Sequence, residues 1–137
     1  MAKFSEASEK MLATCHPKLR ELMHEVIKGI DCKIICGFRG QDEQERAFEQ
    51  GFSKAHFGES KHNIYPSEAV DVAPYPLDWK DERRFYVLGG YIKATADRLG
   101  IKIRQGLDWD GDMNLKDQNF HDLPHVELLQ EPTSTGN

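Results

Sequence analysis

The sequence has no long apolar run and no concentration of basic residues. Its 137 residues include 18 Lys and Arg against 23 Asp and Glu, which gives a formal net charge of −5 at pH 7. A membrane-spanning helix needs about 18 or more consecutive apolar residues, and nucleic-acid-binding domains usually carry a basic stripe. We therefore expect no membrane span and no nucleic acid as a partner.

Cysteine is scarce, and the number of cysteines is odd. Three cysteines do not make a paired disulfide framework, and in a reducing cytosol they stay thiols. Cys32 and Cys36 fall on one face of an expected strand together with Ile34, so we predict that both are small core residues. Residues 1–6 lack the apolar stretch of a secretory signal, so we expect synthesis in a cytoplasm.

Hydrophobic periodicity predicts a mixture of helices and strands. We expect helices over residues 5–14, 17–30, 43–50 and 81–99, and strands over residues 33–36, 68–73, 101–104 and 125–129. Asp42 is expected to cap the third helix and Gly100 to end the fourth. Helices and strands do not alternate regularly, so we predict an α+β domain with a small antiparallel sheet and helices packed on one face.

The chain length fits one domain, residues 1–137, and we expect residues 130–137 to form a flexible polar tail. Residues 51–68 form a long irregular segment with two histidines, His56 and His62. Loops of this length inside compact domains are usually functional. We therefore expect this segment to carry part of the functional site.

Two histidines and two aspartates offer the residue types of a catalytic zinc site. Such a site takes three nitrogen or oxygen ligands, keeps one position open for water, and needs a nearby base. His62, Asp71 and His125 could be the ligands, and Asp122, three residues before His125, could be the base. Strand alternation places Asp71 between small neighbours, which leaves room for a metal.

Spacing alone leaves another interpretation open. His62 and Asp71 are nine residues apart, which fits no helical ligand pair. His62 could be a loop histidine, Asp71 a capping carboxylate and His125 a strand histidine bonded to the backbone, because single His and Asp residues are common in loops. The spacing does not decide between these interpretations.

An acidic loop follows over residues 108–117. An EF-hand counted from Asp108 would need Gly and Glu where the chain has Met113 and Asn119, so we exclude an EF-hand. A looser cation site and a solvated turn that positions Trp109 both stay open.

Several motifs together resemble the zinc metallopeptidases that cut peptidoglycan stem peptides. This family includes D-alanyl-D-alanine carboxypeptidases and the L-alanyl-D-glutamate endopeptidase endolysins of bacteriophages. The likeness runs from about residue 12 to residue 129, and its motifs are Gly37-Phe38-Arg39 with Gln44, Ser60-x-His62, Ala69-x-Asp71 and Asp122-x-x-His125-Val126-Glu127-Leu128.

Two positions depart from the usual family pattern. Residues 63–68 replace a shorter link that contains glycine, and they resemble the phage subgroup with H-N-x-x-P-S-x-A-V-D. Gln105 stands where relatives often carry tryptophan, so we expect one wall of the cleft to differ.

His56 lacks the Ser-x-His pattern, which favours His62 as the ligand.

The resemblance implies the role of each site residue. His62, Asp71 and His125 would bind zinc, Asp122 would be the catalytic base, and Arg39 would hold the oxyanion or a substrate carboxylate. Gln44 and Ser60 match positions that contact substrate. A helix-surface amide for Gln44 and a turn hydroxyl for Ser60 are the alternatives.

The function implied is a phage endolysin, a zinc-dependent L-alanyl-D-glutamate endopeptidase. A D-alanyl-D-alanine carboxypeptidase and a non-catalytic zinc-binding interaction module are the alternatives. The expected partner is the peptidoglycan stem peptide, and we expect a monomer. It would be made in the host cytoplasm and reach the cell wall after the membrane is permeabilised.

Overall fold

The computed structural model describes residues 2–109, 111 and 122–129. The tail predicted for residues 130–137 and most of the acidic loop lie outside the described residues. In chain order the elements are α1 (Glu6–Leu12), α2 (Pro17–Gly29), β1 (Cys32–Cys36), α3 (Gln41–Glu49), the 3-10 helix η1 (Lys61–Asn63), β2 (Ala69–Pro74), α4 (Glu82–Leu99), β3 (Ile103–Gln105) and β4 (His125–Leu128).

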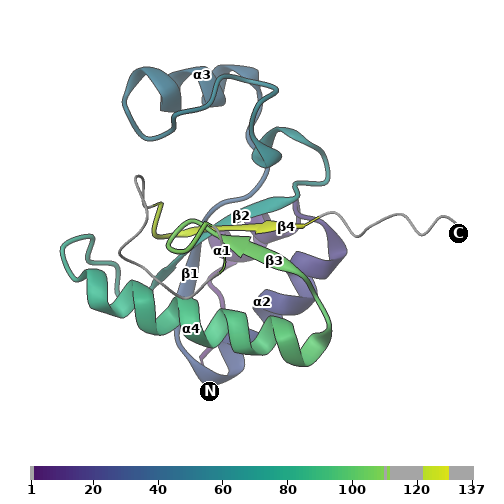
Figure 1. Ribbon diagram of the computed structural model, residues 1–137, viewed down its shortest axis with the longest axis vertical. Coiled ribbons are helices and arrows are strands. Elements are labelled where there is room, and N and C mark those ends of the chain that lie inside the picture. The colour runs from purple at the N-terminus through teal and green to yellow at the C-terminus, as the bar shows by residue number, and fades with distance from the viewer. Residues whose placement is uncertain (1, 110, 112–121, 130–137) are drawn as a thin grey trace, which may run out of the picture.

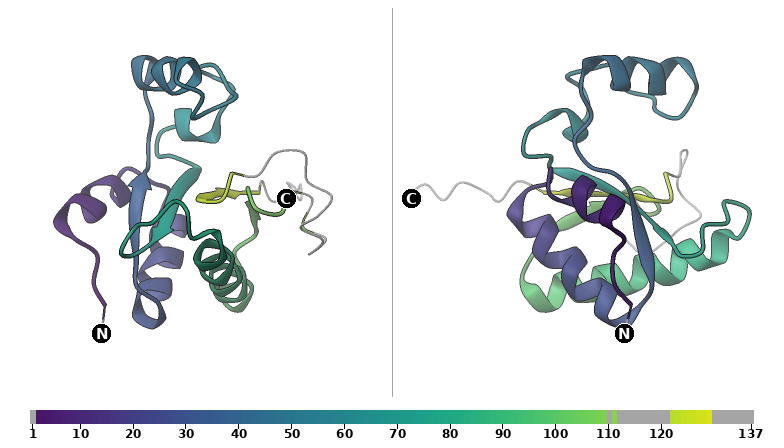
Figure 2. Two further views of the ribbon diagram at one scale, coloured as in Figure 1. Left: turned by 90° about the vertical axis from the view of Figure 1, so that its left-hand side faces the viewer. Right: turned by 180° about the vertical axis from the view of Figure 1, so that it is seen from behind.

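The four strands form one antiparallel sheet in the order β1-β2-β4-β3 (Figure 1). The predicted α+β class with a small antiparallel sheet is confirmed. Helices α2 and α4 lie on one side of the sheet, whereas α3 and η1 lie on the other (Figures 1 and 2). Helix α1 packs beside β1.

Local signals set most helix ends. Ser5 Oγ accepts a hydrogen bond of 3.1 Å from the Ser8 amide at the start of α1, Pro17 opens α2, and Gly100, with φ of 73°, ends α4. The start of α3 differs from the prediction. Gly40 is its N-cap, because the Glu43 carboxylate accepts from the Gly40 amide, so Asp42 lies inside the helix.

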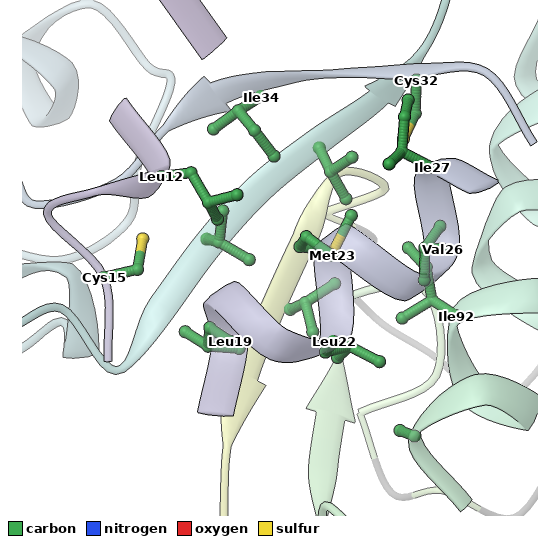
Figure 3. Close-up of a cluster of buried hydrophobic side chains, with 14 of the residues drawn as sticks. Leu12, Cys15, Leu19, Leu22, Met23, Val26, Ile27, Cys32, Ile34 and Ile92 are labelled. Atoms are coloured by element: carbon green, nitrogen blue, oxygen red, sulfur yellow. The ribbon is translucent and has the colours of Figure 1, made fainter. Parts of the chain in front are cut away.

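The hydrophobic core lies between the sheet and the α2–α4 layer. Alternate strand residues such as Ile34, Val70 and Val126 belong to the core cluster, together with Leu22 of α2 and Ile92 of α4. Figure 3 shows Ile34, Leu22 and Ile92 among its side chains. Each such fully buried side chain contributes about 1.5–3 kcal/mol relative to exposure. The intervening strand residues face the side of α3 and η1. Within the described part of the chain, no helix has both the length and the apolarity needed to cross a membrane.

Candidate metal centre

Strand register brings two of the predicted ligands together. Asp71 of β2 lies directly across from His125 of β4, and cross-strand partners project from the same face of a sheet. His125 Nδ1 is 3.3 Å from Asp71 Oδ1. The neighbouring pair, Val70 and Val126, points into the core.

His62 reaches the same carboxylate oxygen from η1. Its side chain is only 2% exposed, and its Nε2 is 3.1 Å from Asp71 Oδ1. Ser60 Oγ accepts from the His62 amide, and the His62 carbonyl accepts from the Arg39 amide at 2.8 Å. The first bond is local to η1, and the second ties the irregular segment to the loop after β1. His62, Asp71 and His125 therefore meet although they come from three separate parts of the chain.

The two histidine-to-Asp71 spacings match the spacing between neighbouring ligands of a small tetrahedral cation. Two nitrogen or oxygen ligands at zinc bond lengths lie about 3.3–3.4 Å apart in a tetrahedron, and the two histidine-to-Asp71 distances are 3.1 and 3.3 Å. On its other side, His62 Nδ1 donates to the Gly37 carbonyl at 2.8 Å. Such outer partners orient metal-binding imidazoles.

Electrostatics at the three residues are strongly coupled. Burial lowers the pKa of His62, but the negative charge of Asp71 outweighs burial and raises that pKa to about 10. Burial likewise opposes the hydrogen bonds from Asp71 and Glu127 that raise the pKa of His125 to about 9. Asp71 is itself buried, which would raise its pKa. The two imidazoles nevertheless hold the pKa of its carboxyl far below its usual range. The protein without a cation therefore holds protons where a cation would bind.

Asp122 lies beside the cluster without belonging to it. Its Oδ2 is 3.9 Å from His125 Nδ1. Burial and the nearby charge of Asp71 raise the pKa of Asp122 to about 6, close to the range in which a carboxylate can accept and return a proton at neutral pH.

The turn that places Asp122 depends on Gly106. The Asp122 amide donates to the Gly106 carbonyl at 3.0 Å, and the Gly106 amide donates to the His125 carbonyl at 2.9 Å. A Cβ on Gly106 would lie 2.8 Å from Asp122 Cβ and still closer to the Asp122 backbone. Nothing in the sequence around Gly106 signals this contact, which depends on a segment 16 residues further along the chain.

Arg39 and Gln44 form one hydrogen-bonded unit. Arg39 Nη2 is 3.4 Å from Asp71 Oδ2, and Arg39 Nη1 donates to Gln44 Oε1 at 3.0 Å. The Gln44 amide group donates to Ser53 Oγ and the Ala55 carbonyl, and the residue is 0% exposed. Gln44 is therefore neither a surface amide nor exposed to a substrate; it holds Arg39. Ser60 lines the pocket while its hydroxyl caps η1.

The prediction for Cys36 is wrong. A register shift between Ile34 and Cys36, a β-bulge, pairs Ile34 with Val72 on the core face but Cys36 with Asp71 on the site face. Ligand atoms of Cys36, His62 and Asp71 all lie within 4.8 Å of one another. Cys32 lies before the bulge and is in the core, as predicted.

Two other expectations concern the surroundings of the cluster. Gln105 does not form a cleft wall, because it pairs with Val126 on the core face and donates to the Gly89 carbonyl of α4 at 2.8 Å. His56 stays outside the cluster, where its Nδ1 is 3.0 Å from Glu45 in an exposed pair.

A polar pocket of about 180 Å³ opens over the cluster. Besides the three converging side chains, Asp122, Ser60 and Trp109 line it, and the Trp109 ring centroid is 5.3 Å from that of His125. Three cationic residues also contribute to the lining: Arg39, Lys54 and Arg104. The pocket therefore combines a candidate cation site, a carboxylate with a raised pKa, and positive charge that suits an anionic ligand.

Comparison with known proteins agrees with the geometry. The model of the phage L-alanyl-D-glutamate peptidase family matches residues 1–129. The chain belongs to this family. It is 33% identical over 137 residues to the L-alanyl-D-glutamate peptidase of Escherichia phage T5, with 93% of this chain and 98% of that protein covered. The resemblance inferred from the motifs is confirmed.

A solved structure shares the fold of this family member. The crystal structure of the Serratia marcescens L-Ala D-Glu endopeptidase ChiX superposes with a TM-score of 0.73 at 21% identity, and covers 93% of this chain and 91% of that chain. At this identity the likeness concerns the fold.

Proposed function

We propose that this protein is a zinc-dependent endopeptidase that cuts the L-alanyl-D-glutamate bond of peptidoglycan stem peptides and acts as a phage endolysin. One observation carries the proposal: His62 Nε2 and His125 Nδ1 converge on Asp71 Oδ1 in a member of the phage L-alanyl-D-glutamate peptidase family. His62, Asp71 and His125 would hold the zinc, because their atom types suit it and both histidine nitrogens lie at ligand-like distances from Asp71.

The residues around the cluster have different roles in hydrolysis. When bound, zinc supplies a Lewis acid that polarises a peptide carbonyl and acidifies water. Asp122 accepts the proton of the attacking water and passes it to the leaving amine. The Arg39 guanidinium stabilises negative charge on the carbonyl oxygen or holds a substrate carboxylate. Gln44 keeps Arg39 in place, and Ser60 borders the substrate path.

The charge of the pocket supports a stem-peptide substrate. Arg39, Lys54 and Arg104 line it, and the D-glutamate of the stem peptide has a carboxylate next to the bond to be cut. Guanidinium and ammonium groups form strong, charge-assisted hydrogen bonds with carboxylates. We also propose that the enzyme is a monomer.

Product analysis on purified peptidoglycan tests this function. An L-alanyl-D-glutamate endopeptidase exposes new D-glutamate amino groups and leaves L-alanine on the glycan, whereas a D-alanyl-D-alanine carboxypeptidase releases free D-alanine. We expect new D-glutamate amino groups, their loss after chelator treatment and their return with zinc. Release of D-alanine alone would favour the carboxypeptidase, and bound zinc without new ends would favour a non-catalytic module.

We also propose that the enzyme is made in the host cytoplasm and reaches the wall after the membrane is permeabilised. Expression alone should therefore leave cell turbidity unchanged, and addition of a membrane-permeabilising agent should cause lysis, because the substrate lies outside the membrane. Turbidity traces with and without the agent measure this, with the Asp122→Asn variant as control. Rapid lysis of intact cells would contradict the proposal.

A further inference from the structure

A second carboxylate lies beneath the cluster on the site face of β4. Glu127 follows His125 by two residues, so both side chains project from the same face of the strand. Glu127 is only 6% exposed, and buried carboxylates are unusual unless they are paired. One oxygen, Oε1, is 2.8 Å from His125 Nε2. Glu127 therefore contacts the imidazole on the nitrogen that faces away from Asp71.

The other oxygen of Glu127 is held by cations from two further segments. Arg104 of β3, the cross-strand partner of Glu127, donates to Oε2 from Nε at 3.2 Å and from Nη2 at 2.9 Å. Lys61 Nζ is 3.7 Å from the same oxygen and donates to the Leu128 carbonyl. These contacts hold the carboxylate in one orientation, with Oε1 directed at His125.

The two histidines consequently present different nitrogens to the cluster. A carboxylate only accepts hydrogen bonds, so Glu127 keeps a proton on His125 Nε2, and the proton that a bound cation would displace is the one on Nδ1, which faces Asp71. The Gly37 carbonyl also only accepts, so it keeps a proton on His62 Nδ1 and leaves Nε2 to face Asp71. Without its partner, His125 could carry its proton on Nδ1, and an N–H cannot bind a metal.

We propose that Glu127 is a positioning residue that makes His125 an Nδ1 ligand of the metal, and that Arg104 and Lys61 hold Glu127 for this purpose. The assignment rests on the proposed zinc site. It adds a role for Glu127 and Arg104 that the motif alone does not supply. Carboxylates behind metal-bound histidines typically change metal affinity 10–100-fold when removed, because they fix the tautomer and raise ligand basicity.

The first test measures zinc affinity by competition with a chromophoric chelator. Glu127→Gln keeps the shape of the side chain and removes its charge, and should weaken zinc binding about 10–100-fold. The matched control is Glu45→Gln, since Glu45 makes the same kind of contact with His56, 3.0 Å long, at the surface. The control should bind zinc within about twofold of the wild type. Glu127→Gln with wild-type affinity would overturn the assignment.

The second test needs no variant, so it holds even if Glu127→Gln fails to fold. In the zinc-loaded wild type with ¹⁵N-labelled histidine, two-bond proton–nitrogen correlations show which ring nitrogen carries a proton. We expect Nε2–H with metal at Nδ1 for His125, and the reverse for His62. Zinc at Nε2 of His125 would overturn the assignment and leave the zinc site intact. A wild type that binds no zinc would instead overturn the proposed function and, with it, this assignment.

Discussion

The two faces of the same sheet carry opposite kinds of side chain, aliphatic on one and ionisable on the other. On the α2–α4 side, Ile34, Val70 and Val126 pack against aliphatic side chains. On the other side, Asp71, His125 and Glu127 are almost as well buried, yet all three have ionisable side chains. Adjacent residues of one strand thus enter an apolar core and a cluster of charges.

The difference shows where stability and function come from. The apolar face gains free energy from burial, whereas each ionisable group on the polar face needs a partner to offset the loss of water. Burial and these partners together lower the pKa of Asp71 and raise the pKa values of His62, His125 and Asp122. Displaced pKa values that gather in a pocket are typical of functional sites.

Removing a ligand should have the largest effect, and only on the polar face. His62→Ala deletes one of three proposed donors, so bound zinc should fall to background and peptidase activity should vanish while the fold persists. Elemental analysis after dialysis measures the bound zinc, and circular dichroism measures whether the fold persists. His56→Ala, in the same segment, is the matched control and should keep its zinc. Full zinc in His62→Ala would refute the ligand assignment.

Removing the proposed base should separate catalysis from metal binding. Asp122→Asn keeps size but cannot accept a proton, so the rate should fall about 10²–10⁴-fold, or roughly 3–5 kcal/mol of barrier, with zinc content unchanged. Zinc content and turbidity clearance of outer-membrane-stripped cells are measured on one preparation. Asp97→Asn on α4 is the control. Zinc loss would make Asp122 a ligand, and normal clearance would assign the base elsewhere.

A cavity in the apolar face should lower stability and leave zinc binding unchanged. Leu22→Ala should lower the free energy of unfolding by about 2–5 kcal/mol, because Leu22 is fully buried, and should leave zinc affinity within about twofold. Denaturant titration measures the free energy of unfolding, and chelator competition measures the zinc affinity. Val87→Ala, on the exposed side of α4, should change stability by no more than about 0.5 kcal/mol. A large loss of zinc affinity in Leu22→Ala would show that the faces are not independent.

The smallest expected effect is that of pH on zinc affinity. The pKa values of His62 and His125, about 10 and 9, lie above their ordinary value, so both imidazoles are protonated at pH 7 before a cation binds. Zinc must displace those protons, so zinc affinity should rise with pH up to about 10, the higher of the two pKa values, with about two protons released per zinc at pH 7. Calorimetry in buffers of different ionisation enthalpy counts them. Binding without proton release would contradict the raised pKa values.

The sequence predicted the local features of the fold well. Ser5, Pro17 and Gly100 define helix ends through their own backbone or side-chain chemistry, and α4 ends at Gly100 as expected. The start of α3 was wrong by two residues, because Glu43 reaches back to Gly40. For the site, the sequence indicated four residues that the structure brings together: His62, Asp71, Asp122 and His125.

Strand alternation and residue type are local properties, so the sequence by itself determined that Asp71 lies opposite Val70 and Val72 on its strand, and which side chains could serve as ligands. Only the tertiary structure decided how those side chains meet. The bulge that turns Cys36 toward Asp71, the contact of Gly106 with Asp122, and the nitrogen that each histidine presents all depend on pairing between distant segments. His125 and Asp71, for example, are 54 residues apart. Period-two alternation is set within one strand, whereas register and hydrogen-bond partners are set by the strand beside it.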